Sequence, residues 1–128
     1  MLMGILGMNM RNRLTEALLG QEIEVRFVSL AEGLRLVPSA VLIDLAAIEA
    51  ALQAPMRAAL AGEGDLLELA ARLAEAVLQA AAFAEHNQQV AEAAAALFLR
   101  KNGVEYTSQV AAAVQHRYAS GTQHANDC

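Results

Sequence analysis

The stretch DLLELAARLAEAVLQAAAFAEHNQQVAEAAAALFLRKNGV, residues 65–104, decides the fold class. Apolar residues recur every three or four positions in both of its halves, which predicts two amphipathic helices. The first runs from Leu66 to about Ala82, and the second follows a break at 83–87 and ends at Lys101. Alanine is so frequent in both that we expect close packing through small side chains, either within one core or in a homodimer. The fold class is therefore mainly α.

Capping signals place the remaining helices on both sides of this stretch. Ser29 with Glu32, and Asp65 with Glu68, have the spacing of a capping box. In this motif the first residue's side chain accepts from the backbone N–H of the second residue, and the second residue's side chain accepts from the backbone N–H of the first. Asp44 is a further N-cap candidate, and Pro55 is expected to stop the helix that Asp44 begins. The additional helices are thus predicted over 11–19, 30–36, 44–54 and 109–118.

One segment predicts a strand. Residues 22–27 alternate charged and apolar side chains with a period of two, as a half-buried strand does. Because a single strand is not stable alone, it needs a partner, and residues 104–106 are the candidate by composition. The sequence therefore predicts a small two-stranded β pair at one edge of the helices.

The 128 residues fit one compact domain with two flanking segments. We expect an N-terminal arm at 1–20, partly disordered, a helical domain at 21–118 and a disordered tail at 119–128. The apolar opening at 1–10 is too short to span a membrane, and no basic residue precedes it, so we expect no signal peptide and no membrane span. An arm that associates with a membrane surface is a weaker alternative to a flexible tail. Four methionines could be the true translation start: Met1, Met3, Met8 and Met10.

Charge and cysteine content narrow the function classes. The net charge is -5 and the nine basic residues are spread along the chain, which argues against nucleic-acid binding. The single cysteine, Cys128, excludes a disulfide framework and fits a cytoplasmic protein. His116 and His124 have no cysteine or carboxylate at ligand spacing, so no metal site is expected.

Two segments carry a resemblance to a known family. Residues 44–55 (DLAAIEAALQAP) resemble the D-x-x-L-L-E-x-A-L-x-x-P stretch of the Fic/Doc (death-on-curing) family. Residues 81–104 resemble its signature H-x-F-x-[DN]-[AG]-N-K-R-T and the apolar helix behind it, and FLRKNGV at 98–104 matches that helix end almost letter for letter. The resemblance covers about residues 26–106 and implies a Fic/Doc-like helical bundle.

The resemblance also implies a chemistry. Family members transfer AMP, phosphate or a similar group from a nucleotide to a protein, and the Doc toxin, which a small antitoxin restrains, phosphorylates elongation factor Tu. The motif's His is the general base, its acidic residue holds a metal, and its Asn and basic residues hold phosphate. In the ungapped register the motif falls on Ala81, Phe83, Glu85, His86, Asn87, Gln88 and Gln89.

The departures from the motif predict that this chemistry is lost. Ala81 stands where the base should be, and an alanine cannot accept a proton. Gln88 and Gln89 replace the two cations that offset phosphate charge. We therefore expect no catalytic residue, no cofactor and no metal, and we interpret the chain as an inactive Fic/Doc-fold protein. Its partner would be a protein, either an antitoxin-like peptide or a second copy of the chain.

Two alternatives remain open from the residues. His86 could substitute for the missing base, which would leave a weak nucleotide-dependent transferase. Asn87 and Gln88, with the free N–H groups of the helix start, could still bind a nucleotide or phosphate, with or without magnesium. Asn87 could equally do no more than cap the helix.

Overall fold

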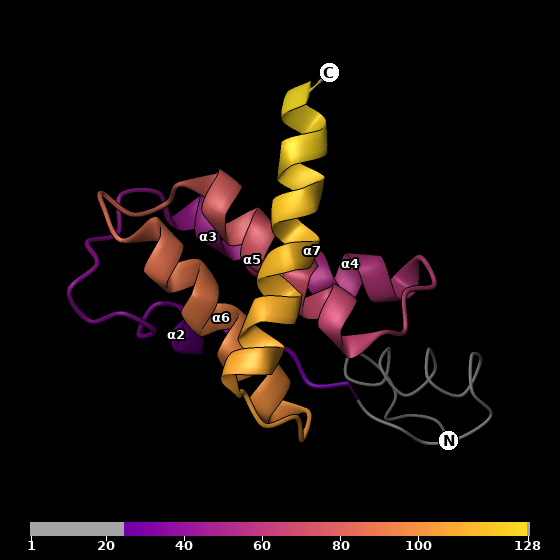
Figure 1. Ribbon diagram of the computed structural model, residues 1–128. Coiled ribbons are helices and arrows are strands. Elements are labelled where there is room, and N and C mark those ends of the chain that lie inside the picture. The colour runs from indigo at the N-terminus through magenta and orange to yellow at the C-terminus, as the bar shows by residue number, and fades with distance from the viewer. Residues whose placement is uncertain (1–24, 128) are drawn as a thin grey trace.

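The computed structural model describes the backbone of residues 25–127 and the side chains of residues 25–118 (Figure 1). The described part of the chain is mainly helical, as the sequence predicts. The helix α5 lies at the centre and packs against four others. The helices are α2 (Leu30–Gly33), α3 (Leu45–Leu52), α4 (Ala54–Leu60), α5 (Leu66–Ala80), α6 (Asn87–Lys101) and α7 (Ser108–Asp127).

Small residues form the contact between α5 and α6. Ala70, Ala74, Ala91 and Ala94 are fully buried there, and larger core side chains such as Phe98 surround them. The absence of bulk lets the two helix backbones approach closely, and the larger neighbours supply most of the buried apolar area. The small-residue faces of these helices are thus buried within one chain.

The predicted caps are confirmed. Ser29 and Glu32 form a reciprocal capping box at α2, with bonds of 2.9 and 3.1 Å. Asp44 accepts from the N–H of Ala47 at α3, and Asp65 accepts from the N–H of Leu67 at α5. The capping box predicted for Asp65 with Glu68 is not formed, because the N–H of Asp65 donates to Glu63 instead. The helix at α2 is shorter than predicted, ending at Gly33.

The expected role of Pro55 is wrong. The helix that Asp44 begins ends at Leu52, and Pro55 lies in the first turn of a separate helix, α4, which the sequence analysis missed. Proline is well tolerated there because the N–H groups of a first turn have no intrahelical partner in any case. Pro55 therefore begins a helix.

The predicted β pair is not formed among residues 25–127. Residues 25–29 are extended, but their partner is a side chain: Asn102 Oδ1 accepts from the N–H of Arg26, and Asn102 Nδ2 donates to the Arg26 carbonyl, both at 2.8 Å. The amide thus satisfies the backbone groups that a second strand would have bonded. Residues 22–24 of the predicted strand lie outside the described residues.

The last helix is longer than predicted. The α7 backbone continues to Asp127, through the stretch for which the sequence predicted a disordered tail, and it extends away from the other helices beyond its contact with α5 (Figure 1). Arg117 holds α7 to the start of α5 through Asp65 at 2.9 Å and Glu68 at 3.5 Å. The predicted arm at 1–20, with its helix at 11–19, lies outside the described residues.

Among the helices that the structure describes, none combines the length and the apolar composition that a membrane crossing requires. Two basic residues, Arg100 and Lys101, lie in the last turn of α6, where positive charge complements the helix dipole. Lys101 also reaches back to Glu32 at 2.8 Å, which joins the end of α6 to α2. The loop between α5 and α6 carries the predicted motif.

Candidate functional site

The motif loop, residues 81–87, connects α5 to α6 and has a left-handed backbone near each end. Ala81 ends α5 with φ 46° and ψ 46°, and His86 precedes α6 with φ 70° and ψ 20°. A residue with a Cβ pays about 1–2 kcal/mol in this conformation. Two such residues in one short loop persist only because the contacts around them impose the shape.

Backbone hydrogen bonds fix the loop to residues 41–44. The N–H of Ala84 donates to the Val41 carbonyl and the N–H of Ile43 donates to the Ala82 carbonyl, both at 2.8 Å. These bonds flank an antiparallel bridge between Leu42 and Phe83. Phe83 is 4% exposed, and its side chain anchors the loop in the core. The middle of the loop is therefore part of the packed core.

Asn87 completes this arrangement with its side chain. Its Nδ2 donates to the carbonyl of Phe83 at 2.9 Å, and its Oδ1 accepts from the N–H of Phe83 at 3.1 Å. Asn87 is the first residue of α6; the N-cap position belongs to His86, whose side chain makes no capping bond. The expectation that Asn87 caps the helix is therefore wrong, and its side chain instead closes the loop. Anion binding at Asn87 and Gln88 stays a prediction.

The other motif positions point to solvent or to local neighbours. Ala81, Glu85 and Gln89 are exposed, and His86 is half-buried. Gln88 is exposed and reaches Glu92 one turn later at 3.5 Å, the longest separation that still counts as a bond. Within the part of the chain that the structure describes, no three His, Cys, Asp or Glu side chains gather where they could hold a metal ion.

The chemistry that such a loop can perform is limited. It presents a backbone turn and exposed neutral or acidic side chains, and the amide that would contact phosphate is bonded on both sides to Phe83. A carboxylate at Glu85 beside the start of α6 would repel an approaching anion. The fold brings the motif residues together in one loop, where Phe83 and Asn87 hold the turn between α5 and α6.

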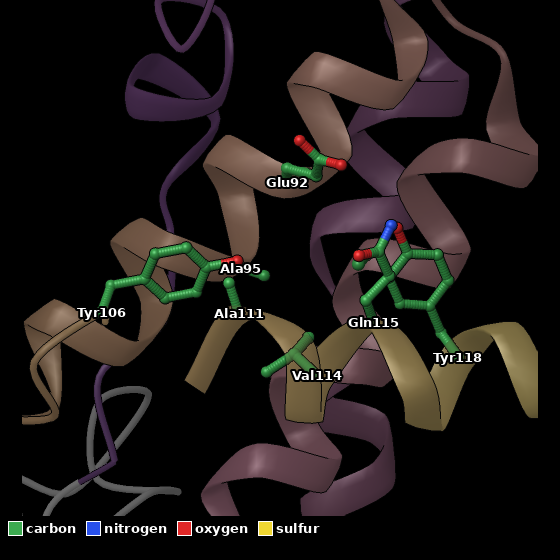
Figure 2. A pocket seen from close by; sticks show the side chains of 8 residues that line it. Glu92, Ala95, Tyr106, Ala111, Val114, Gln115 and Tyr118 are labelled. Atoms are coloured by element: carbon green, nitrogen blue, oxygen red, sulfur yellow. The ribbon is translucent and has the colours of Figure 1, made fainter. Parts of the chain in front are cut away.

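Sequence reasoning missed a cavity on the other side of α6. It lies between α5, α6 and α7, measures about 210 Å³ and includes Glu92, Tyr106 and Tyr118 in its wall (Figure 2). A usable signal was present, because Tyr106 and Tyr118 are the two tyrosines of the chain. What the sequence could not give is the position of α7 relative to the other two helices.

Comparisons of this chain with protein-family models, with curated proteins and with solved structures find no match. The Fic/Doc resemblance accordingly rests on the sequence motifs within residues 26–106. Function is to be inferred from the residues and geometry of the chain itself.

Proposed function

We propose that this chain is a catalytically inactive protein of the Fic/Doc type that acts by binding a protein partner. The observation that carries the proposal is the double hydrogen bond between the Asn87 amide and the backbone of Phe83. That bond uses both polar atoms of the one motif residue that matches the family in its phosphate-binding part. The motif loop then serves the fold, and the Asn87 amide is held against Phe83 with only one N–H and one lone pair left over.

The neighbouring positions support the same conclusion. Ala81 offers a methyl group in place of a base, and general base catalysis contributes roughly 10²–10⁴ in rate. Gln88 and Gln89 are neutral, and phosphoryl transfer depends mainly on positioning and on charge neutralisation. His86 is held by a left-handed backbone between exposed Glu85 and the helix start. Loss of base and cations together should reduce transfer to the uncatalysed rate.

A face beside the loop supports a binding role. Val41, Ile43 and Leu45 are 60%, 65% and 49% exposed, and they lie within five residues of sequence. Val41 and Ile43 flank Leu42, the residue that forms the bridge to Phe83 of the motif loop. Grouped apolar side chains of this kind mark protein interaction sites more often than scattered ones do. The partner is an antitoxin-like peptide or a second copy, in the cytoplasm.

The catalytic half of the proposal is tested by label transfer. The purified full chain is incubated with magnesium and with ATP labelled at the α- or the γ-phosphate, together with elongation factor Tu, beside an active Fic/Doc enzyme as the positive control. We expect no labelled band on either protein. Transfer that disappears in His86→Ala but persists in His116→Ala would show that His86 is a working base and would overturn the proposal.

Residual nucleotide or phosphate binding is a separate outcome, measured by calorimetric titration. ATP, AMP and inorganic phosphate are titrated with and without magnesium. We expect no heat of binding at millimolar ligand, because the Asn87 amide is already bonded and no cation stands beside it. Saturable heat that is abolished in Gln88→Glu would instead identify a phosphate site at the start of α6.

The binding half is tested at the apolar face by analytical ultracentrifugation. Ile43→Asp introduces a charge into this face at a 65% exposed position, so the fold should be unaffected. If the partner is a second copy, the wild-type chain sediments as a dimer and this variant as a monomer. Arg57→Asp, also at an exposed position but on α4, is the control and should not change the sedimentation.

A further inference from the structure

The cavity between α5, α6 and α7 has an apolar floor and a polar mouth. Its inner wall consists of small or buried apolar side chains, from Ala74 of α5, Ala95 of α6 and Val114 of α7. The two tyrosines lie at opposite ends of the first turns of α7. The Tyr106 ring is near Ala95 and Ala111, and the Tyr118 ring is near Gln115 (Figure 2). The exposed side chains of Glu92 and Gln115 stand at the rim.

Tyr118 has an unused polar group in this wall. The residue is 6% exposed and its hydroxyl oxygen is buried, yet the hydroxyl has no hydrogen-bond partner among the described side chains and backbone. Gln115 lies beside the ring, but the geometry of a bond to the hydroxyl is not met. A buried hydroxyl without a partner costs about 1–3 kcal/mol. An occupant of the cavity can satisfy this hydroxyl when the exposed side chain of Gln115, which lies beside it, moves aside.

Glu92 gives the cavity a negative charge. It is the only ionisable carboxylate or basic group among the lining residues. Burial, and then the charge of Glu92, raise the pKa of both Tyr106 and Tyr118 above the ordinary value of 10.0, while Arg100 opposes the rise at Tyr106 and the Gln115 side chain opposes it at Tyr118. The negative potential of one carboxylate thus reaches both rings. Such a potential favours a cation, and the faces of the aromatic rings favour one as well.

Size limits the occupant further. Pockets for drug-sized ligands measure roughly 300–1,000 Å³, whereas this cavity has about 210 Å³. A nucleotide is too large and has the wrong charge. A compact molecule with one positive end and one apolar end matches both the rim and the floor.

We propose that this cavity binds a small organic cation, namely a primary ammonium attached to a compact hydrocarbon body. The ammonium faces Glu92 at the rim and donates to the Tyr118 hydroxyl, and the hydrocarbon lies against Ala74, Ala95 and Val114. Anions are excluded by the same carboxylate. This site is separate from the motif loop and does not depend on the function proposed for that loop.

The chain contains its own probe for this binding. It has two tyrosines and no tryptophan, and both tyrosines line the cavity, so its intrinsic fluorescence arises from the site alone. The full chain is titrated with cyclohexylammonium, cyclohexanol and cyclohexanecarboxylate, which share a body and differ in charge. We expect a saturable fluorescence change with the ammonium at millimolar concentration, a response about tenfold weaker with the alcohol, and none with the carboxylate.

Matched variants locate the cation. Glu92→Gln should weaken cyclohexylammonium binding about tenfold and bring it close to that of cyclohexanol. Glu49→Gln makes the same charge change on an exposed residue of α3, and it should leave binding unchanged. Tyr118→Phe should weaken binding several-fold while leaving the thermal midpoint equal or higher, because it removes an unpaired buried hydroxyl.

Three results would overturn the proposal. One is the absence of any saturable change with all three compounds, which would mean that the cavity takes only water. The second is equal affinity for the ammonium and the alcohol. The third is an equal loss in Glu92→Gln and Glu49→Gln, which would trace binding to the net charge of the protein rather than to this cavity.

Discussion

The start of α6 and the cavity beside its middle use their polar groups in opposite ways. At its start, the Asn87 amide has both its donor and its acceptor bonded to Phe83, so the loop is closed by the chain itself. Two turns further on, the same helix borders a cavity in which the Tyr118 hydroxyl is buried and unpartnered. The first arrangement stabilises the fold, because it holds the amide against the backbone of its own loop. The second is unfavourable for the fold and leaves a group that a ligand can bond.

Among the variants that test this comparison, Asn87→Ala in the motif loop should change the free energy of unfolding most. It leaves both the N–H and the carbonyl of Phe83 without the partners that they have in the part-buried loop. We expect the free energy of unfolding to fall by about 2–4 kcal/mol, since an unsatisfied buried polar group costs about 1–3 kcal/mol. Urea denaturation followed by circular dichroism measures it.

Gln88→Ala is the control for this variant. Gln88 is the next residue of α6 and is exposed, so its change to alanine should alter the free energy of unfolding by less than about 0.5 kcal/mol. If Asn87→Ala were as mild as this control, the amide would be free in solution. The loop would then be open to an anion after all.

A smaller effect of opposite sign is expected at the same loop for His86→Gly. The His86 backbone has φ 70°, a conformation that glycine adopts without the cost borne by residues with a Cβ. We expect the free energy of unfolding to rise by about 1 kcal/mol, measured by the same denaturation. A loss of stability would show that the imidazole makes a contact that the loop needs.

The smallest effect is expected on the tyrosine titration of the cavity. Burial first, and the charge of Glu92 second, raise the pKa of both hydroxyls above 10.0, so Glu92→Gln should lower both values and Glu49→Gln should not. Ultraviolet absorbance of the phenolate measures this. An identical titration in wild type and Glu92→Gln would place the carboxylate away from the rings.

The raised pKa values of Tyr106 and Tyr118 determine how the free energy of unfolding changes at alkaline pH. The unfolded chain loses its phenol protons near pH 10, whereas the folded chain holds them to higher pH. The folded state therefore binds more protons above pH 10, and the free energy of unfolding falls as the pH rises through that range. Below pH 10 the two tyrosines contribute no pH dependence.

Local signals in the sequence predicted local structure well. Ser29, Asp44 and Asp65 were identified as caps because a cap depends on residues two or three positions away, and each accepts the expected backbone bond. Pro55 was misassigned because proline is compatible with both the end and the first turn of a helix. The strand at 22–27 was paired with the wrong element, since nothing in the periodicity shows that the Asn102 side chain can replace a strand.

The candidate sites were less predictable than the helices. The resemblance at 81–104 located the loop, but the bonding of Asn87 to Phe83 depends on a left-handed turn that its sequence does not signal. Tyr118 was assigned to the last helix with no expectation of a cavity. Its surroundings come from three helices whose contacts are far apart in sequence, and such packing is decided by the whole chain.

One nuclear magnetic resonance experiment on the ¹⁵N-labelled full chain tests most directly whether the motif loop is closed and the cavity is a binding site. The same sample is titrated first with ATP and magnesium and then with cyclohexylammonium. We predict that the nucleotide leaves the side-chain amide signals of Asn87 unmoved, and that the ammonium shifts the backbone signals of Ala111 and Gln115 while leaving those of Phe83 in place. Displacement of the Asn87 amide signals by the nucleotide, with no response at Ala111 and Gln115 to the ammonium, would contradict the account.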